Sequence, residues 1–127
     1  MPKNEFLCDC HPIDQALVAK TKAAMPDSQT FLSLSDFFSI LGDTTRCRIL
    51  YALKDNPMCV CDLANVLSMT KSSISHQLSK MKAAGVVKCE KLGKQVFYSP
   101  DDDHVFEIFH TSLHHIRHKA KEQPYEK

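Results

Sequence analysis

The stretch that most constrains the fold is residues 56–85, which holds two short helical patterns separated by a break at residues 68–70. In the second pattern, Ile74, Leu78 and Met81 recur at steps of four and three residues, which predicts a helix with one apolar face. Two short helices joined by a tight turn are typical of a helix-turn-helix unit, whose second helix enters the major groove of DNA.

The outward face of this second helix is polar and carries short hydrogen-bonding groups flanked by cations. It consists of Lys71, Ser72, Ser73, Ser75, His76, Gln77 and Lys80. The serine and glutamine side chains are predicted to read base edges, and the lysines to contact phosphate groups. The alternative is a solvated polar face, because many helix-turn-helix folds bind no DNA.

After residue 85 the pattern changes from helical to alternating, which predicts two strands at residues 86–91 and 95–99. Lys91 and Lys94 lie near the tip of this ribbon, where they would contact backbone phosphate beside the recognition helix. A ribbon in this place is a wing, and it strengthens the prediction of a DNA-binding surface.

Further helices are expected before and after this unit, at residues 12–25, 31–41 and 45–54 and from the acidic run 101–103 onward. The last helix is too apolar to remain in water, so it is predicted to pack against a second copy of itself. The predicted fold is therefore mainly α with a small β-hairpin: a winged helix-turn-helix dimerised through its N- and C-terminal helices. Its predicted divisions are an N-terminal metal-ligand tail with a short helix (1–30), the winged domain with its dimerisation helix (31–121) and a tail (122–127).

Composition limits the classes of function. The content is 43% apolar and 24% charged, as in globular proteins, and the formal net charge of +1 requires any basic surface to be local. No apolar run has transmembrane length and no signal segment is evident, so a cytoplasmic location is expected. No C-x-x-C, glycine-rich phosphate loop or acid–base pair beside a nucleophile is found, so an enzyme is not expected.

Four of the six cysteines form two C-x-C pairs, Cys8 with Cys10 and Cys59 with Cys61. Thiolates select cadmium, lead, zinc or trivalent arsenic over hard ions. Because residues two apart on an ideal helix point in nearly opposite directions, Cys59 and Cys61 can share a metal only if the helix start is irregular. A four-coordinate site would need two more thiolates, and Cys8 and Cys10 are the only other pair. The alternative is that Cys59 and Cys61 fill the core, as expected for the two unpaired cysteines.

The last helix holds a second set of candidate ligands, Asp102-x-His104 and His115-x-x-His118. A helix separates His104 from His115 by about 16 Å, at ~1.5 Å per residue, so one metal cannot reach both pairs within a chain. Two antiparallel copies would join the pairs across the dimer into two intersubunit O/N sites suited to zinc. The alternative is a solvated, histidine-rich helix end. His110 and His114 lie off the helix face of His115 and His118, and they are expected to be ordinary surface groups.

From about Leu32 to His118 the sequence resembles the ArsR/SmtB family of metal-sensing repressors. The similar segments are LGDTTRCRIL, which follows an L-x-D-x-T-R-x-x-I-L pattern, CVCDLANVL and SSISHQLSKMKAAGVV. The N-terminal cysteines together with C-V-C resemble the cadmium- and lead-sensing branch usually called CadC. The spacing of Cys8 and Cys10 is shorter than in that branch, and His11 is an alternative ligand.

This resemblance implies a homodimeric transcriptional repressor that binds a palindromic operator without metal and dissociates when Cd(II), Pb(II) or Zn(II) binds. Metal efflux or resistance genes would be its targets. The set on the last helix matches the zinc-sensing site of the family. The alternative function is a thiol redox sensor on the same scaffold, in which the C-x-C pairs oxidise to disulfides. Double-stranded DNA and a second copy of the chain are the expected partners, with no membrane and no small organic substrate.

Overall fold

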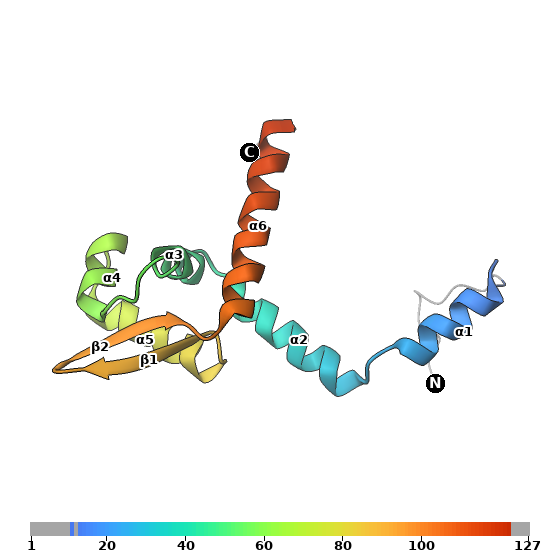
Figure 1. Cartoon of the computed structure of the whole chain (residues 1–127), viewed down its shortest axis with the longest axis horizontal. Helices are drawn as coiled ribbons and strands as arrows, with labels where there is room; N and C mark the ends of the chain where they lie inside the picture. Colours follow the sequence, from blue (N-terminus) through green and yellow to red (C-terminus); the bar gives the residue numbers. More distant parts are fainter. Residues whose placement is uncertain (1–10, 12, 123–127) are drawn as a thin grey trace. The chain divides into compact units, whose positions relative to one another are not determined.

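The structure is a computed structural model that describes residue 11 and residues 13–122 (Figure 1). Its elements in chain order are α1 (Gln15–Ala24), α2 (Ser28–Leu41), α3 (Thr44–Ala52), α4 (Val60–Leu67), α5 (Lys71–Ala83), β1 (Val87–Leu92), β2 (Gln95–Pro100) and α6 (Asp103–Glu122). This order confirms the predicted winged helix-turn-helix. By internal contacts the chain divides into residues 1–33 and residues 34–127, so α2 begins in one unit and ends in the other. None of the described helices is both long and apolar enough to span a membrane.

Side-chain caps start the first two helices. Asp14 accepts a hydrogen bond from the N–H of Leu17 at 2.9 Å, and Asp27 accepts one from the N–H of Thr30 at 2.8 Å. The side chain and the N–H of Thr30 together hold the pKa of the Asp27 carboxyl below its ordinary value. Because Asp27 caps it, α2 begins at Ser28, one turn before the predicted start.

One apolar core holds residues 34–127 together. The predicted inner face of α5 is confirmed, because Ile74, Leu78 and Met81 each have 0% of their surface exposed. They pack with core residues from the other elements, which are Ile49, Leu50, Leu53, Leu63, Ala64, Leu67, Val86, Val87 and Val105. Helix α5 contacts α3, α4 and β1, so its orientation is fixed from several sides.

The backbone at Ser68 makes the turn between α4 and α5. Ser68 lies in the left-handed region at φ 55° and ψ 48°, and the N–H of Met69 donates to the carbonyl of Ala64 at 2.9 Å. Thr70 then caps α5 by accepting a hydrogen bond from the N–H of Ser73 at 3.1 Å. Since few non-glycine residues adopt a left-handed conformation, this turn sets a specific angle between the two helices.

The predicted wing is the antiparallel hairpin of β1 and β2, in which Leu92 pairs with Gln95. Gly93 and Lys94 form its two-residue turn, and Gly93 has a φ of 64°. Glycine at the first central position is typical of the type II′ turn, whose twist matches that of the flanking strands. The tip of the wing is therefore tight and carries a lysine.

Two backbone hydrogen bonds that the sequence did not predict join the segment before α4 to the wing. The N–H of Met58 donates to the carbonyl of Tyr98 at 3.1 Å, and the N–H of Tyr98 donates to the carbonyl of Met58 at 2.8 Å. Cys59 follows directly, so the backbone on its N-terminal side is held by β2.

Replacing Leu78 by alanine is expected to lower the free energy of unfolding by about 2–5 kcal/mol, because a fully buried side chain leaves a cavity in the core. The matched control is Leu92→Ala, since Leu92 is 55% exposed and its truncation should change stability by less than about 1 kcal/mol. Urea unfolding at one fixed protein concentration measures both. Equal losses for the two variants would contradict this account of the core.

Candidate DNA-binding surface and metal-binding sites

The side chains predicted to meet DNA lie on an accessible surface formed by α5 and the wing. The exposed members are Lys71, Ser72, Ser75, His76, Lys80, Lys91 and Lys94, and the half-buried members are Ser73 and Gln77. The apolar face of α5 is buried on the opposite side, so this helix is held by its core contacts while its polar face remains open. Such an arrangement suits base contacts from a helix and phosphate contacts from a wing.

Arg46 on α3 connects three elements, and the sequence analysis missed it. Its Nε–H donates to the carbonyl of Ile40 at the end of α2, at 2.6 Å. Its Nη1–H donates to Oε1 of Gln77 on α5, at 3.1 Å. The amide oxygen of Gln77 is therefore engaged within the protein, and its NH2 group remains for a base edge. The signal in the sequence was the arginine of the L-x-D-x-T-R-x-x-I-L pattern, which does not say what its side chain contacts.

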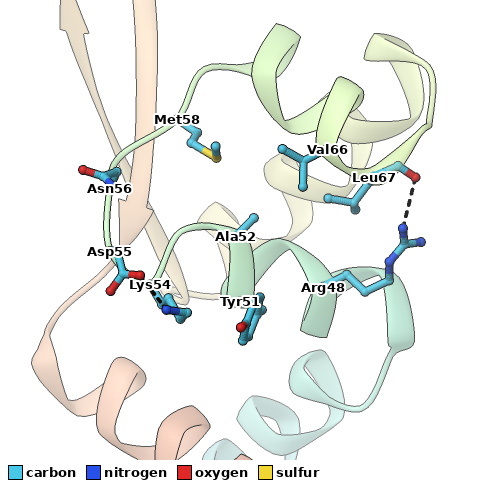
Figure 2. A pocket seen from close by; sticks show the side chains of 9 residues that line it. All are labelled: Arg48, Tyr51, Ala52, Lys54, Asp55, Asn56, Met58, Val66 and Leu67. Carbon is cyan, nitrogen blue, oxygen red and sulfur yellow. Dashed lines mark hydrogen bonds and ion pairs between the residues drawn. The ribbon is translucent and has the colours of Figure 1, made fainter.

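A groove of about 510 Å³ lies between α3 and α4 (Figure 2). At one end, Nη2 of Arg48 donates to the carbonyl of Leu67 at 3.1 Å, which places a cation at the C-terminus of α4. At the other end, Lys54 pairs with Asp55 and lies 5.2 Å from the centre of the Tyr51 ring. The hydrogen bond to Asp55 raises the pKa of Lys54. The bond from Arg48 joins α3 to the last residue of α4, directly before the turn into α5, whereas the contacts of Lys54 lie at the end of α3.

The two thiols of the C-V-C segment lie at the start of α4 in different backbone conformations. Cys59 is the N-cap residue, extended at φ −85° and ψ 169°, whereas Cys61 is already helical. Cys59 thus lies just before the helix, in the extended conformation usual for an N-cap residue, so the angle that an ideal helix sets between residues two apart does not apply to this pair. Cys59 is 8% exposed and Cys61 is half-buried, and both are free thiols.

These two thiols do not make a complete metal site within the described part of the chain. Among residues 11 and 13–122, no group of three or more His, Cys, Asp or Glu side chains is arranged to hold one ion. The other predicted thiolates, Cys8 and Cys10, lie outside the described residues. A four-coordinate thiolate site therefore requires ligands from beyond α4.

Asp102 and His104 come together at the start of α6. Oδ1 of Asp102 accepts a hydrogen bond from the N–H of Val105 at 3.0 Å, and Oδ2 lies 3.5 Å from Nδ1 of His104. The bond from Val105 is the main cause that lowers the pKa of the Asp102 carboxyl, and His104 lowers it further. His115 and His118 lie exposed near the far end of the same straight helix. The chain therefore does not join the two pairs by itself.

A second groove, of about 480 Å³, is almost entirely apolar and lies between α6, α3 and the end of α2. Phe38 and Ile116 on its rim remain 52% and 47% exposed. Phe109 and Leu113 line it from α6. Exposed apolar side chains beside an apolar groove are a feature of surfaces that other proteins cover.

Comparisons with known proteins agree with this geometry. The family described as "Bacterial regulatory protein, arsR family" matches residues 43–88, from the cap of α3 into β1. The transcriptional repressor SmtB homolog of Synechocystis sp. is 31% identical over 111 residues, which cover 87% of this chain and 84% of that protein. The cadmium resistance transcriptional regulatory protein CadC homolog of Staphylococcus aureus is 33% identical over 115 residues, covering 90% and 94%.

Among solved structures, the homodimeric winged helix-turn-helix DNA-binding domain of a possible ArsR-family regulator from Mycobacterium bovis is similar, with a TM-score of 0.71. The similarity covers 83% of this chain and 99% of that domain. At 19% identity it concerns the fold.

A double-mutant cycle tests the link between α3 and α5. Arg46→Lys and Gln77→Ala should each destabilise the protein, and the double variant should be less destabilised than the sum by about 1 kcal/mol, because both changes remove the same hydrogen bond. Urea unfolding of the four proteins at equal concentration measures this coupling. Strictly additive losses would show that the two side chains do not interact.

Proposed function

The chain belongs to the ArsR family of bacterial transcriptional regulators, and on that premise we propose that it is a metal-responsive repressor. It binds operator DNA as a homodimer in the metal-free state and dissociates when Cd(II), Pb(II) or Zn(II) binds, thereby controlling metal efflux or resistance genes. The observation that supports this function most directly is the pair Cys59 and Cys61 at the start of α4, the helix that packs against α5.

The DNA-binding part of the proposal rests on local charge and exposure. The formal net charge is only +1, so attraction to DNA depends on where the cations lie. Lys71 and Lys80 flank the polar face of α5, and Lys91 and Lys94 lie at the wing tip. These four lysines contact phosphate on either side of the groove that α5 reads.

The thiol part rests on the two connections of Cys59. On one side Met58 is hydrogen-bonded to Tyr98 of the wing, and on the other side α4 leads through the Ser68 turn into α5. In the proposed site, one ion is bound by Cys59 and Cys61 together with Cys8 and Cys10, or with His11 as a substitute ligand. Binding this ion would shift the start of α4. Metal releases DNA only if the ion binds that shifted conformation more tightly than the DNA-binding one. The cadmium resistance name of the CadC homolog supports cadmium as an inducer.

The dimer rests on the apolar surfaces of α2 and α6. Exposed Phe38 and Ile116 beside the 480 Å³ groove would be covered by a second copy. Antiparallel pairing of two α6 helices would place Asp102 and His104 of one chain near His115 and His118 of the other. The resulting intersubunit site holds zinc with oxygen and nitrogen donors.

Cadmium is expected to release the wild-type protein from its operator, and Cys59→Ser is expected to abolish that release while metal-free DNA binding persists. The reason is that serine keeps the size of the side chain but offers no soft donor. The measurement is fluorescence anisotropy of a labelled operator duplex, selected from random-sequence DNA by the metal-free protein, under reducing conditions at fixed salt.

The matched control is Cys47→Ser, because the Cys47 thiol donates a hydrogen bond to the Leu41 carbonyl and a serine hydroxyl can keep that hydrogen bond. A His115→Ala variant serves as the complementary control, which should keep the cadmium response and lose the zinc response. If cadmium still released the Cys59→Ser variant from the operator, the assignment of Cys59 as a metal ligand would be wrong. Release by an oxidant, with no effect of either metal, would instead identify a redox sensor.

Lys91→Ala is expected to weaken operator binding and lower the slope of log K against log salt by about 2, roughly 0.9 for each wing of the dimer. The effect should be the same on operator and non-operator DNA, because a phosphate contact carries no sequence information. Anisotropy titrations at several salt concentrations measure the slope. Lys119→Ala on α6 is the control, and an equal change there would indicate a general charge effect.

A further inference from the structure

The exposed face of α6 carries two histidines that the proposed regulatory sites do not use, His110 and His114. They are four residues apart in a helix, so their Cβ atoms lie about 5–6 Å apart on the same face. Imidazole pairs at this spacing are a known way for a helix to bind zinc. From the sequence, both are expected to be ordinary surface groups, off the face of His115 and His118.

The packing of α6 keeps this pair in solvent. Val105 is 4% exposed and Phe109 packs against the core, and these residues mark the inner face of the helix. At about 100° per residue, His110 and His114 lie roughly 100–180° around the helix from them. Both are exposed, so ligand exchange with a dissolved metal ion meets no barrier from the fold.

Phe106 orients the first of the two rings. The rings of Phe106 and His110 are stacked, with centroids 5.7 Å apart and planes 9° from parallel. The nitrogen lone pairs of imidazole lie in the ring plane, so contact on the ring face leaves them available to a metal. The stack also restricts the ring before binding, which reduces the entropy lost when a metal is held.

The charges near the pair are balanced. Glu107 lies one turn before His110, and Arg117 lies about one turn after His114. The carboxylate favours a bound cation and the guanidinium opposes it, so the affinity depends on the two imidazoles acting together. Imidazole donors suit Zn(II), Ni(II) and Cu(II), and two of them leave the remaining coordination positions to water.

We infer that His110 and His114 form a separate bis-imidazole site, one on each protomer, for a borderline divalent cation of the Ni(II) and Zn(II) class. An ion held there links two successive turns and stabilises α6. The site lies within one chain and does not need the dimer, so it stands independently of the proposed regulatory function.

Calorimetric titration with Ni(II) tests this site in full-length, reduced protein carrying Cys59→Ser and His115→Gln, which disable both proposed regulatory sites. One ion per protomer is expected to bind. Adding His110→Gln or His114→Gln should each weaken binding by about a hundredfold, as expected when a donor held at high effective concentration is lost. Unchanged affinity in either variant would overturn the inference.

A matched control keeps the number of histidines constant. His110→Gln combined with Lys20→His puts the imidazole on exposed α1, where no histidine lies three or four residues away. This variant should bind as weakly as His110→Gln alone. Recovery of the affinity would show that histidine content, not spacing, determines binding, and would contradict the inference.

Imidazole ¹⁵N NMR with diamagnetic Zn(II) locates the ion directly and also works in the wild-type protein if the parent variant folds poorly. In the wild-type protein, signals of both His110 and His114 should shift together as zinc is added, in addition to any shifts of His104, His115 and His118. Absence of shifts at His110, or a paired shift of His114 and His118 without His110, would overturn the assignment. Neither measurement uses DNA release, so failure here leaves the repressor function untouched.

Discussion

Burial of one face of α5 is the constraint on which the rest of the structure depends. Ile74, Leu78 and Met81 are fully enclosed by α3, α4 and β1, and a helix fixed on one face presents its opposite face in a single orientation. The same burial sets where the chain must leave α5, since Val86 and Val87 directly after it are also in the core. The wing therefore starts from a fixed point beside the recognition helix.

Cys59 lies between a residue that is paired with the wing and the helix that packs on α5. Its N-terminal neighbour Met58 is paired with the wing strand β2, and its C-terminal neighbours form α4, which packs on α5. The residue itself is extended and nearly buried, with no side-chain capping bond to the helix it precedes. A change in the position of this thiol is thereby transmitted to the wing by hydrogen bonds and to α5 by packing. The proposed intersubunit histidine set, in contrast, would act on DNA only through the relative placement of two whole protomers.

The sequence predicted those features that repeat or that are decided locally. The period of α5, the two strands of the hairpin and the turn around Ser68 each extend over neighbouring residues, and the structure agrees with all three. The pairing of Met58 with Tyr98 joins residues forty apart through one isolated pair of backbone hydrogen bonds, so no sequence pattern predicts it. The hydrogen bond from the Arg46 side chain to Gln77 also joins residues far apart in the sequence, and no pattern predicts it. That Cys59 lies just outside α4 while Cys61 lies within it is likewise known only from the backbone angles.

A modest coupling free energy between metal binding and DNA binding would be sufficient to regulate DNA affinity in a molecule with this charge distribution. With a net charge of +1, the protein as a whole is weakly attracted to DNA, so affinity depends on a few lysines and on α5 being correctly placed at the same time. In the proposed function, a metal ion that displaces one of these elements would break several protein–DNA contacts together. A coupling of about 1–3 kcal/mol, typical of allosteric proteins, then changes operator affinity by roughly 5- to 150-fold. By reciprocity the operator would weaken metal binding by the same factor, so in the proposed function bound DNA would raise the metal concentration needed for release.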